Sequence, residues 1–200
     1  MSKTLSKGSI TLITIGIVIL ILIGGTLTTY NGLVSKDEAA STAWSNLQAQ
    51  YQRRADLVPN LVNTVKGYAK HESETFENVV AARAKATQLS VDADNLTPER
   101  ARQILQAQGD LSTALGKLMA ISESYPELKA SENFSELQAQ LEGTENRIAE
   151  SRRLYNESVQ TFNTAVRRFP ANIVAGIFGF EKKSKFEAQE SAANSPQVEF

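Results

Sequence analysis

A charge-free, apolar run near the N-terminus constrains the fold of this chain more than any other feature. No charged side chain occurs from Gly8 to Ser35, and Ile10 to Leu27 consists almost entirely of Ile, Leu, Val, Thr and Gly. A helix needs about 20 apolar residues to cross a bilayer, whereas the apolar core of a signal peptide has ~7–15 residues and precedes a small-residue cleavage site. We therefore predict an uncleaved transmembrane anchor over residues 9–29, after a short N-terminal tail over residues 1–8. A cleaved signal peptide is the alternative.

Positive charges on the two sides of this run predict its orientation. Lys3 and Lys7 precede it together with the amino terminus, whereas Lys36 is the nearest basic residue after it. Since basic residues hold their side of a membrane protein in the cytoplasm, we expect the N-terminus inside and the rest of the chain outside.

The residues after the anchor have the pattern of long helices. Proline and glycine are sparse between Lys36 and Arg168, and no stretch alternates apolar and polar residues with the period of a strand. Large apolar side chains instead recur every seven residues, which predicts a buried face on each of two helices. One series is Phe134, Leu141, Ile148, Tyr155, Phe162 and Phe169, and the other is Ile104, Leu111, Leu118 and Tyr125.

Start and stop signals bound these two helices. The first begins at Thr97, where the sequence Thr-Pro-Glu is typical of an N-cap followed by a proline and an acid, and it ends at Tyr125, which precedes a proline. In the second, Asn133 and Glu136 resemble a capping box. We expect this second helix to continue to Phe169.

The segment Asp37–Ser90 keeps a helical phase but contains Pro59, and two interpretations stay open. It forms either one kinked helix or two helices that turn near Arg54–Asp56. One helix of this length would extend roughly 80 Å at 1.5 Å per residue and leave its apolar side chains in water. We favour the turn, which places Trp44 opposite Val65. The predicted fold is therefore all-α, with a transmembrane helix followed by an antiparallel up-down four-helix bundle over residues 30–170.

The composition excludes several classes of function. The net charge is -1, so no basic field attracts nucleic acid, and the absence of cysteine excludes thiolate chemistry. His71 is the single histidine, so the pair His71-Glu72 lacks the second histidine of a zinc-protease motif and the serines lack a histidine base. No glycine-rich phosphate-binding loop is present. We expect no catalytic, cofactor-binding or metal-binding residues, and hence no enzyme.

Polar residues gather along the series from Phe134 to Phe169. They form either a binding patch or a hydrogen-bonded layer inside the bundle, and we favour the layer. Arg54 occupies an apolar position of the earlier segment, and because an unpaired buried charge is destabilising it should pair with a carboxylate. The polar residues concerned are Thr144, Glu145, Asn146, Arg147, Arg152, Arg153 and Asn156.

An apolar and basic C-terminal motif over residues 171–187 is the best candidate for a contact surface. Ile173–Phe180 is apolar and interrupted by glycine, and Lys182, Lys183 and Lys185 follow it. This segment either lies at a bilayer surface or folds over the open end of the bundle as a lid. The polar residues 188–200 are predicted to form a flexible tail.

Three segments resemble the motifs of the LemA family. Residues 53–62 read Arg-Arg-Ala-Asp-Leu-Val-Pro-Asn-Leu-Val and lead to Val-Lys-Gly-Tyr-Ala-Lys-His-Glu at 65–72. Residues 141–148 read Leu-Glu-Gly-Thr-Glu-Asn-Arg-Ile and lead to Arg-Arg-Leu-Tyr-Asn at 152–156, while residues 173–180 read Ile-Val-Ala-Gly-Ile-Phe-Gly-Phe. The resemblance extends from Tyr30 to about Phe186. It implies a bacterial, membrane-anchored helical bundle and provides no catalytic residues to carry over.

These expectations describe a single-pass helical scaffold or adaptor of the bacterial inner (cytoplasmic) membrane, with its soluble domain on the outer or periplasmic side. Its expected partners are membrane lipids, through the anchor and Ile173–Phe180, and an unidentified membrane or envelope protein, but no nucleic acid. The alternatives are an accessory subunit of a membrane enzyme such as a protease, or a small-ligand sensor.

Overall fold

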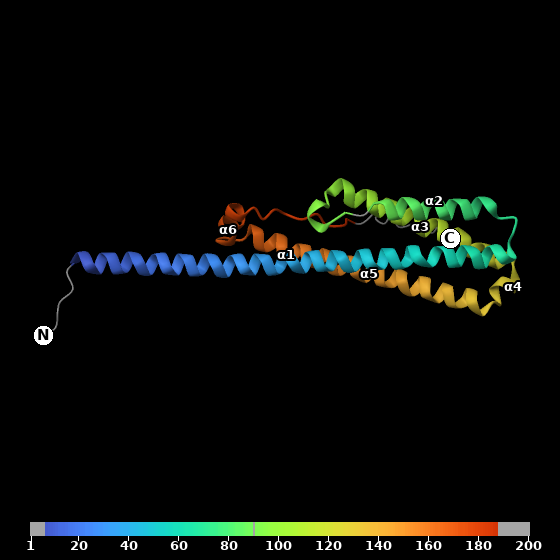
Figure 1. Ribbon diagram of the computed structural model, residues 1–200, viewed down its shortest axis with the longest axis horizontal. Helices are drawn as coiled ribbons and strands as arrows, with labels where there is room; N and C mark the ends of the chain where they lie inside the picture. Colours follow the sequence, from blue (N-terminus) through green and yellow to red (C-terminus); the bar gives the residue numbers. More distant parts are fainter. Residues whose placement is uncertain (1–6, 90, 188–200) are drawn as a thin grey trace, which may run out of the picture.

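The first helix determines the shape of the molecule, because it runs far beyond the domain that packs on it (Figure 1). The computed structural model describes residues 7–89 and 91–187, and these contain helices and connecting segments but no strand. The predicted tail at 188–200, and most of the one at 1–8, lie outside the described residues. The elements are α1 (Lys7–Tyr68), α2 (Ser73–Gln88), η1 (Ala93–Asn95), α3 (Pro98–Ile121), η2 (Ser122–Ser124), α4 (Pro126–Lys129), α5 (Glu132–Arg167) and α6 (Ala171–Phe178).

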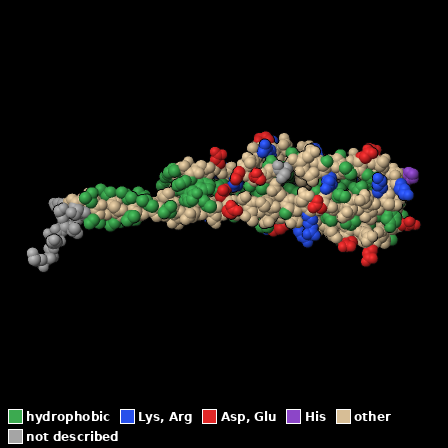
Figure 2. Space-filling view, in the orientation of Figure 1, with side chains coloured by type: hydrophobic (Ala, Val, Ile, Leu, Met, Phe, Trp, Pro, Cys, Tyr) green, Lys and Arg blue, Asp and Glu red, His purple; other side chains and the backbone are tan. Residues whose placement is uncertain are grey.

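The apolar run predicted to be an anchor forms the free N-terminal part of α1. An 18-residue window of this helix has a mean hydropathy of 2.4, and none of that window is buried against the rest of the chain. The space-filling view shows apolar side chains along the part of α1 that projects from the domain, whereas charged side chains are scattered over the domain itself (Figure 2). By length and composition this part of α1 is able to cross a membrane. The expectation of an all-helical chain with one long apolar N-terminal helix is confirmed.

The turn predicted near Arg54–Asp56 is wrong. Helix α1 continues without interruption through this region for 62 residues and includes Pro59. The chain turns instead between Tyr68 and Ser73, so Trp44 and Val65 lie on one helix and do not face each other. The single kinked helix over 37–90 is wrong for the same reason.

A contact from α2 explains how α1 tolerates its proline. Pro59 has no N–H group, so the carbonyl of Ala55, four residues earlier, lacks its usual helical donor. The side chain of Arg83 takes this role, since its Nε donates to the Ala55 oxygen at 2.7 Å. The length argument against a long helix fails because α5, 36 residues long, lies beside much of α1 and covers its apolar face.

The buried side chains form three cores that follow one another along α1. The far core packs α1 against α2, α3, α4 and the start of α5; the middle core packs it against η1, α3 and the middle of α5; the near core packs it against α6. Representative members are Val65, Val79, Leu111, Leu128 and Phe134 in the far core, Trp44, Ile104, Tyr155 and Phe186 in the middle core, and Leu33, Val174 and Ala175 in the near core.

Both seven-residue series form buried faces, with differences at their ends. Ile104, Leu111 and Leu118 are buried on α3, and on α5 the series is buried from Phe134 to Phe162. Phe169, predicted to continue it, is 80% exposed, because α5 ends at Arg167 and the chain turns away.

The two predicted helix starts have different outcomes. The hydroxyl of Thr97 accepts a bond from the backbone N–H of Arg100 at 3.3 Å, which confirms the predicted N-cap. The capping box at Asn133 and Glu136 is wrong, because α5 begins at Glu132 with Ser131 at the N-cap and no side-chain capping bond.

The contact between Arg83 and Ala55 generates a double-mutant prediction. Arg83→Ala should leave a backbone carbonyl without its donor and lower the free energy of unfolding by about 1–3 kcal/mol. In a Pro59→Ala background the restored N–H of residue 59 can bond to that carbonyl, so the same substitution should be less destabilising there. Urea unfolding of the full chain in detergent, followed by circular dichroism, measures both differences. Arg102→Ala, an exposed substitution on α3, is the control. Equal effects of Arg83→Ala in the two backgrounds would contradict this account.

Candidate functional site

The C-terminal motif forms a strap, defined here as residues 179–187, that runs along α5. Two asparagines one heptad apart on α5 hold it by paired hydrogen bonds. Asn163 accepts from the backbone N–H of Lys183 at 2.9 Å and donates to its carbonyl at 2.8 Å. Asn156 makes the same two bonds to Phe186, at 2.9 and 2.8 Å. Each amide therefore satisfies both backbone groups of one strap residue, which fixes the register of the strap on the helix.

The ring of Phe186 completes the middle core. It is 5% exposed, and its centroid lies 5.7 Å from that of Trp44 and 5.6 Å from that of Tyr155. The indole Nε1 of Trp44 donates to the Val91 carbonyl at 2.7 Å, and the Tyr155 hydroxyl donates to the Ser184 carbonyl at 2.9 Å. Burial raises the pKa of Tyr155 to about 12.

Lys183 is turned towards the domain. Its side chain is only 8% exposed, and its Nζ lies 2.8 Å from Asp37 on α1 and 2.6 Å from Asp94 in η1. Burial alone would lower the pKa of this ammonium group, but its bonds to the two carboxylates outweigh that effect and raise it. Of the three lysines that follow Phe180, Lys183 therefore joins α1, η1 and the strap through ion pairs.

Arg54 is the most deeply buried charge, at 1% exposure, and it pairs with a carboxylate as predicted. Its Nη1 lies 2.5 Å from Glu145 Oε1 on α5 and 2.7 Å from Ser112 Oγ on α3. Its Nη2 donates to the backbone oxygen of Gln108 at 3.2 Å and also bonds to the Gln108 side chain. One guanidinium group thus connects three helices.

A polar cleft of about 740 Å³ opens beside this network, between α3 and α5. Arg152, Arg153 and Asn156 line it together with Arg54 and Glu145. Arg153 is paired with Glu150 and Glu157 on its own helix. Its hydrogen bonds hold the pKa of the Glu150 carboxyl below its usual range.

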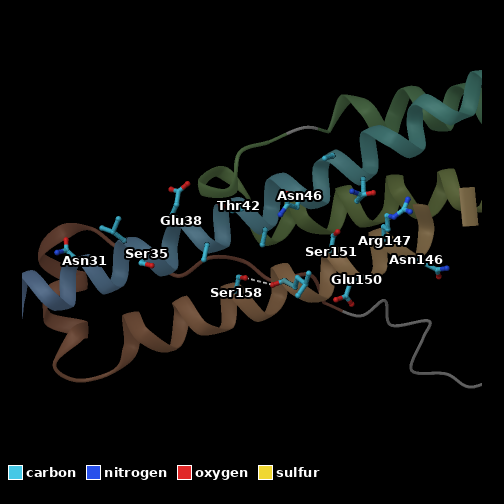
Figure 3. A pocket seen from close by; sticks show the side chains of 16 residues that line it. Asn31, Ser35, Glu38, Thr42, Asn46, Asn146, Arg147, Glu150, Ser151 and Ser158 are labelled. Carbon is cyan, nitrogen blue, oxygen red and sulfur yellow. Dashed lines mark hydrogen bonds between the residues drawn. The ribbon is translucent and has the colours of Figure 1, made fainter. Parts of the chain in front are cut away.

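A larger groove of about 1140 Å³ runs along the seam between α1 and α5. Figure 3 shows side chains of both helices along it, from Asn31 near the apolar end of α1 to Asn46 further along. Most of its lining is small or apolar, and Gln50 Oε1 lies buried at its far end with no hydrogen-bond partner among the described residues. The small or apolar residues that line it include Ser35, Ala39, Thr42, Ala43, Ala49, Ser151, Leu154 and Ser158.

The predicted polar layer on α5 is divided between these two openings. Glu145, Arg152, Arg153 and Asn156 face the cleft, whereas Asn146 and Arg147 line the groove. Thr144 is fully buried between them, and its hydroxyl donates to the Gln140 carbonyl at 2.7 Å. Glu145 thus belongs to a hydrogen-bonded network inside the bundle, as the favoured interpretation expected, whereas Asn146 and Arg147 line an opening.

His71 lies in the turn between α1 and α2, exposed at the end of the molecule far from the apolar part of α1 (Figure 2). Within residues 7–89 and 91–187, no three His, Asp or Glu side chains gather in a way that could hold a metal ion. Because α1 continues to Tyr68 without a turn near Arg54–Asp56, His71 lies at the end of the domain opposite the apolar run.

Neither the hydrogen bonds by which Asn156 and Asn163 hold the strap nor the groove was predicted from the sequence. The seven-residue spacing of Asn156 and Asn163 was a usable signal, because it places both amides on one face of α5. No sequence pattern indicated the groove, since it depends on how α1 and α5 pack against each other.

A helical domain carried on one long apolar N-terminal helix defines a class of proteins suited to membrane association. The sequence signature of the LemA family matches residues 43–200, and the chain belongs to this family. It is 27% identical over 186 residues to the magnetosome protein MamQ of Magnetospirillum gryphiswaldense, covering 84% of this chain and 68% of the relative. It is 26% identical over 179 residues to the protein LemA of Metamycoplasma hominis, covering 90% of this chain and 76% of the relative.

The strap generates a prediction that the single tryptophan can report. Asn156→Ala and Asn163→Ala should each remove two hydrogen bonds and lower the free energy of unfolding by about 1–3 kcal/mol. Asn156→Ala should also shift the emission of Trp44 to longer wavelength, because Phe186 would no longer exclude water from the indole. Asn78→Ala, an exposed position on α2, is the matched control. Unchanged Trp44 emission in the Asn156 variant would contradict the strap geometry.

The raised pKa of Tyr155 generates a pH prediction. The neutral phenol is favoured in the folded state, so its contribution is fully present below the ordinary tyrosine pKa of 10 and is lost as pH rises to about 12. The full chain should lose up to about 2 kcal/mol of unfolding free energy across this interval through Tyr155. Tyr155→Phe should be less stable at pH 8 but lose less stability between pH 10 and 12. Parallel stability curves of the two proteins would refute this role.

Proposed function

We propose that this chain is a non-catalytic scaffold or adaptor of the bacterial inner membrane, with residues 9–29 as a single-pass anchor and its domain on the periplasmic side. The charge-free run of α1 supports the anchor, and the lysines before it support the orientation. The relatives' names associate them with magnetosomes and with the LemA family, and these names mention no chemical reaction.

The proposal includes an antiparallel up-down four-helix bundle made of the last part of α1 with α2, α3 and α5. Three pairs of contacts support this arrangement, because in each pair a later residue on one helix meets an earlier one on the other. Between α1 and α2, Arg83 bonds to the Ala55 carbonyl, and Gln48 bonds to the carbonyl of Val91 just after α2. Between α1 and α5, Arg54 bonds to Glu145 and the ring of Trp44 packs on that of Tyr155. Between α2 and α3, Lys85 bonds to Asp110 and the Ala86 carbonyl accepts from Gln108.

The groove between α1 and α5 carries the proposed function. It begins at Asn31, directly after the anchor, and follows the axis of α1, which has no joint between the apolar part and the domain. A helix that leaves the same membrane beside the anchor would run straight into it. Small side chains such as Ser35, Ala39 and Ala43 allow the close approach of a second helix.

We therefore infer that the occupant is an amphipathic, membrane-proximal helix of another membrane protein. Its apolar side would lie on the small residues and on Leu154, and a donor side chain would reach the unpartnered oxygen of Gln50. A partner that is a membrane enzyme would make this chain its accessory subunit. A small-ligand sensor would use the polar cleft as its binding site. The buried charge of Arg54 beside that cleft is already paired with Glu145, so the groove is the better candidate.

Site-specific crosslinking in native membranes tests the groove. A photoreactive benzoylphenylalanine at Thr42 should capture a second protein, and the captured peptide should map within or just beyond a transmembrane span of that protein. The same group at Thr87, an exposed threonine on α2, should not capture it. Filling the groove with Ala39→Trp should lower the crosslinking yield roughly tenfold, because overpacking a helix contact costs ~1–3 kcal/mol.

Ala84→Trp is the matched control for the filling variant, since it is an exposed alanine on α2 outside the groove. It should leave the yield unchanged. Capture of a second copy of this chain, or of a peptide far from any membrane span, would contradict the proposed occupant. A yield that Ala39→Trp does not lower would show that the crosslink does not report on the groove.

A further inference from the structure

Helix α6 has a buried face and an apolar face that nothing in the described residues covers. Val174 and Ala175 are buried in the near core, but four large apolar side chains on the helix or just before it are at least half exposed. Their exposed fractions are 80% for Phe169, which precedes the helix, 54% for Ile173, 71% for Ile177 and 52% for Phe178, which is partly covered by Tyr30. An amphipathic helix in water would normally present polar residues on this side, so the outward face of α6 requires an occupant.

The buried face holds α6 at a fixed height on α1. Leu33 packs against Val174 and Ala175, and the ring of Tyr30 lies 4.7 Å from that of Phe178 and 5.8 Å from that of Phe180. The helix ends at Phe178 and is capped by Gly179, whose φ of 76° lets the backbone N–H of Phe180 donate to the Ala175 carbonyl at 2.9 Å. The strap then continues to Lys183, whose two ion pairs secure it.

This height coincides with the end of the apolar run. At 1.5 Å per residue, Tyr30 and Leu33 lie about 2 and 6 Å beyond residue 29 along the helix axis. Figure 2 shows the apolar surface of α6 next to the apolar part of α1, on the side of the domain that faces it. A membrane that holds the anchor would therefore have its headgroup region at α6.

The charges around α6 are basic on its N-terminal side and mixed on its C-terminal side. No acidic residue occurs between Arg167 and Phe180, exposed Arg167 and Arg168 precede the helix, and exposed Glu181 and Lys182 follow it. An apolar helix face bordered by basic side chains is the pattern of segments that lie in the interface of a bilayer with anionic lipids.

We propose that α6 is a second membrane contact, whose outward face enters the boundary between headgroups and acyl chains of the bilayer that holds the anchor. This inference rests on the anchor of the proposed function. The domain would then meet the membrane at two elements, α1 and α6, which fixes its tilt and its rotation about the anchor. The groove would consequently face a defined direction in the plane of the membrane.

Single environment-sensitive labels on the full chain test this contact, since the chain contains no cysteine. A nitrobenzoxadiazole group on Ile177→Cys is compared with the same group on Val80→Cys, an exposed valine on α2. The proteins are reconstituted in phosphatidylcholine–phosphatidylglycerol vesicles, with and without lipids spin-labelled near the headgroup. The label at 177 should emit at shorter wavelength and be quenched by the spin-labelled lipids, whereas the label at 80 should show neither effect.

Two outcomes overturn the proposal. Water-like emission at 177 means that α6 does not reach the bilayer, and short-wavelength emission that spin-labelled lipids do not quench means that protein covers it. A third label on Ile19→Cys separates this failure from failure of the anchor. Quenching at 19 by lipids labelled deep in the acyl chains, without quenching at 177, removes the second contact alone, whereas no quenching at 19 removes the anchor as well.

The basic residues supply an independent measurement. Substituting Arg167, Arg168 and Lys182 by glutamine together should reduce the emission shift at 177 in vesicles that contain phosphatidylglycerol, and leave it unchanged in phosphatidylcholine alone. An unchanged shift in both lipids would overturn the electrostatic part of the proposal.

Discussion

The buried charge of Arg54 is the constraint on which the arrangement of the helices depends. A guanidinium group at 1% exposure is tolerated only where hydrogen bonds and a carboxylate surround it. Glu145, Ser112 and Gln108 provide these partners from α5 and α3, so a shift of either helix by one turn would leave the charge unpaired. The apolar cores stabilise the packing without direction, whereas Arg54 selects one register. The same register brings Trp44 beside Tyr155 and α6 beside Tyr30.

Much of the fold was predictable from local patterns, and the main error came from a contact between distant residues. The charge-free run, the N-cap at Thr97 and the seven-residue series identified α3, α5 and the apolar part of α1. Pro59 left a kink and a turn as open interpretations, because proline removes a helical hydrogen bond, and the length of an unbroken helix favoured the turn. The side chain of Arg83, on another helix, replaces that hydrogen bond, and no pattern in the sequence around Pro59 indicates such a replacement. The prediction that Phe169 is buried was wrong for a similar reason, since a seven-residue period does not indicate where the neighbouring helices end.

The candidate site was predictable in its residues but not in its geometry. The sequence identified the polar residues near Thr144 and the apolar segment near Ile173. It did not indicate that α5 distributes the first set over a cleft and a groove, or that Asn156 and Asn163 hold the strap. Which side of a helix faces an opening depends on the positions of its neighbours, and those follow from pairings such as that of Arg54 with Glu145.

The unbroken course of α1 gives the molecule the mechanics of a rigid lever. From Tyr30 to Tyr68 the helix extends about 57 Å at 1.5 Å per residue, with no flexible joint where it meets the domain. With residues 9–29 in a bilayer, as proposed, a change of about 10° in the tilt of this part would sweep the far end sideways by about 10 Å, and a second membrane contact at α6 would oppose such a change. The turn that contains His71 would move most, and α6, close to the fulcrum, would move least. On the proposed anchor, small changes of tilt at the membrane would thus become large displacements at the opposite end of the domain.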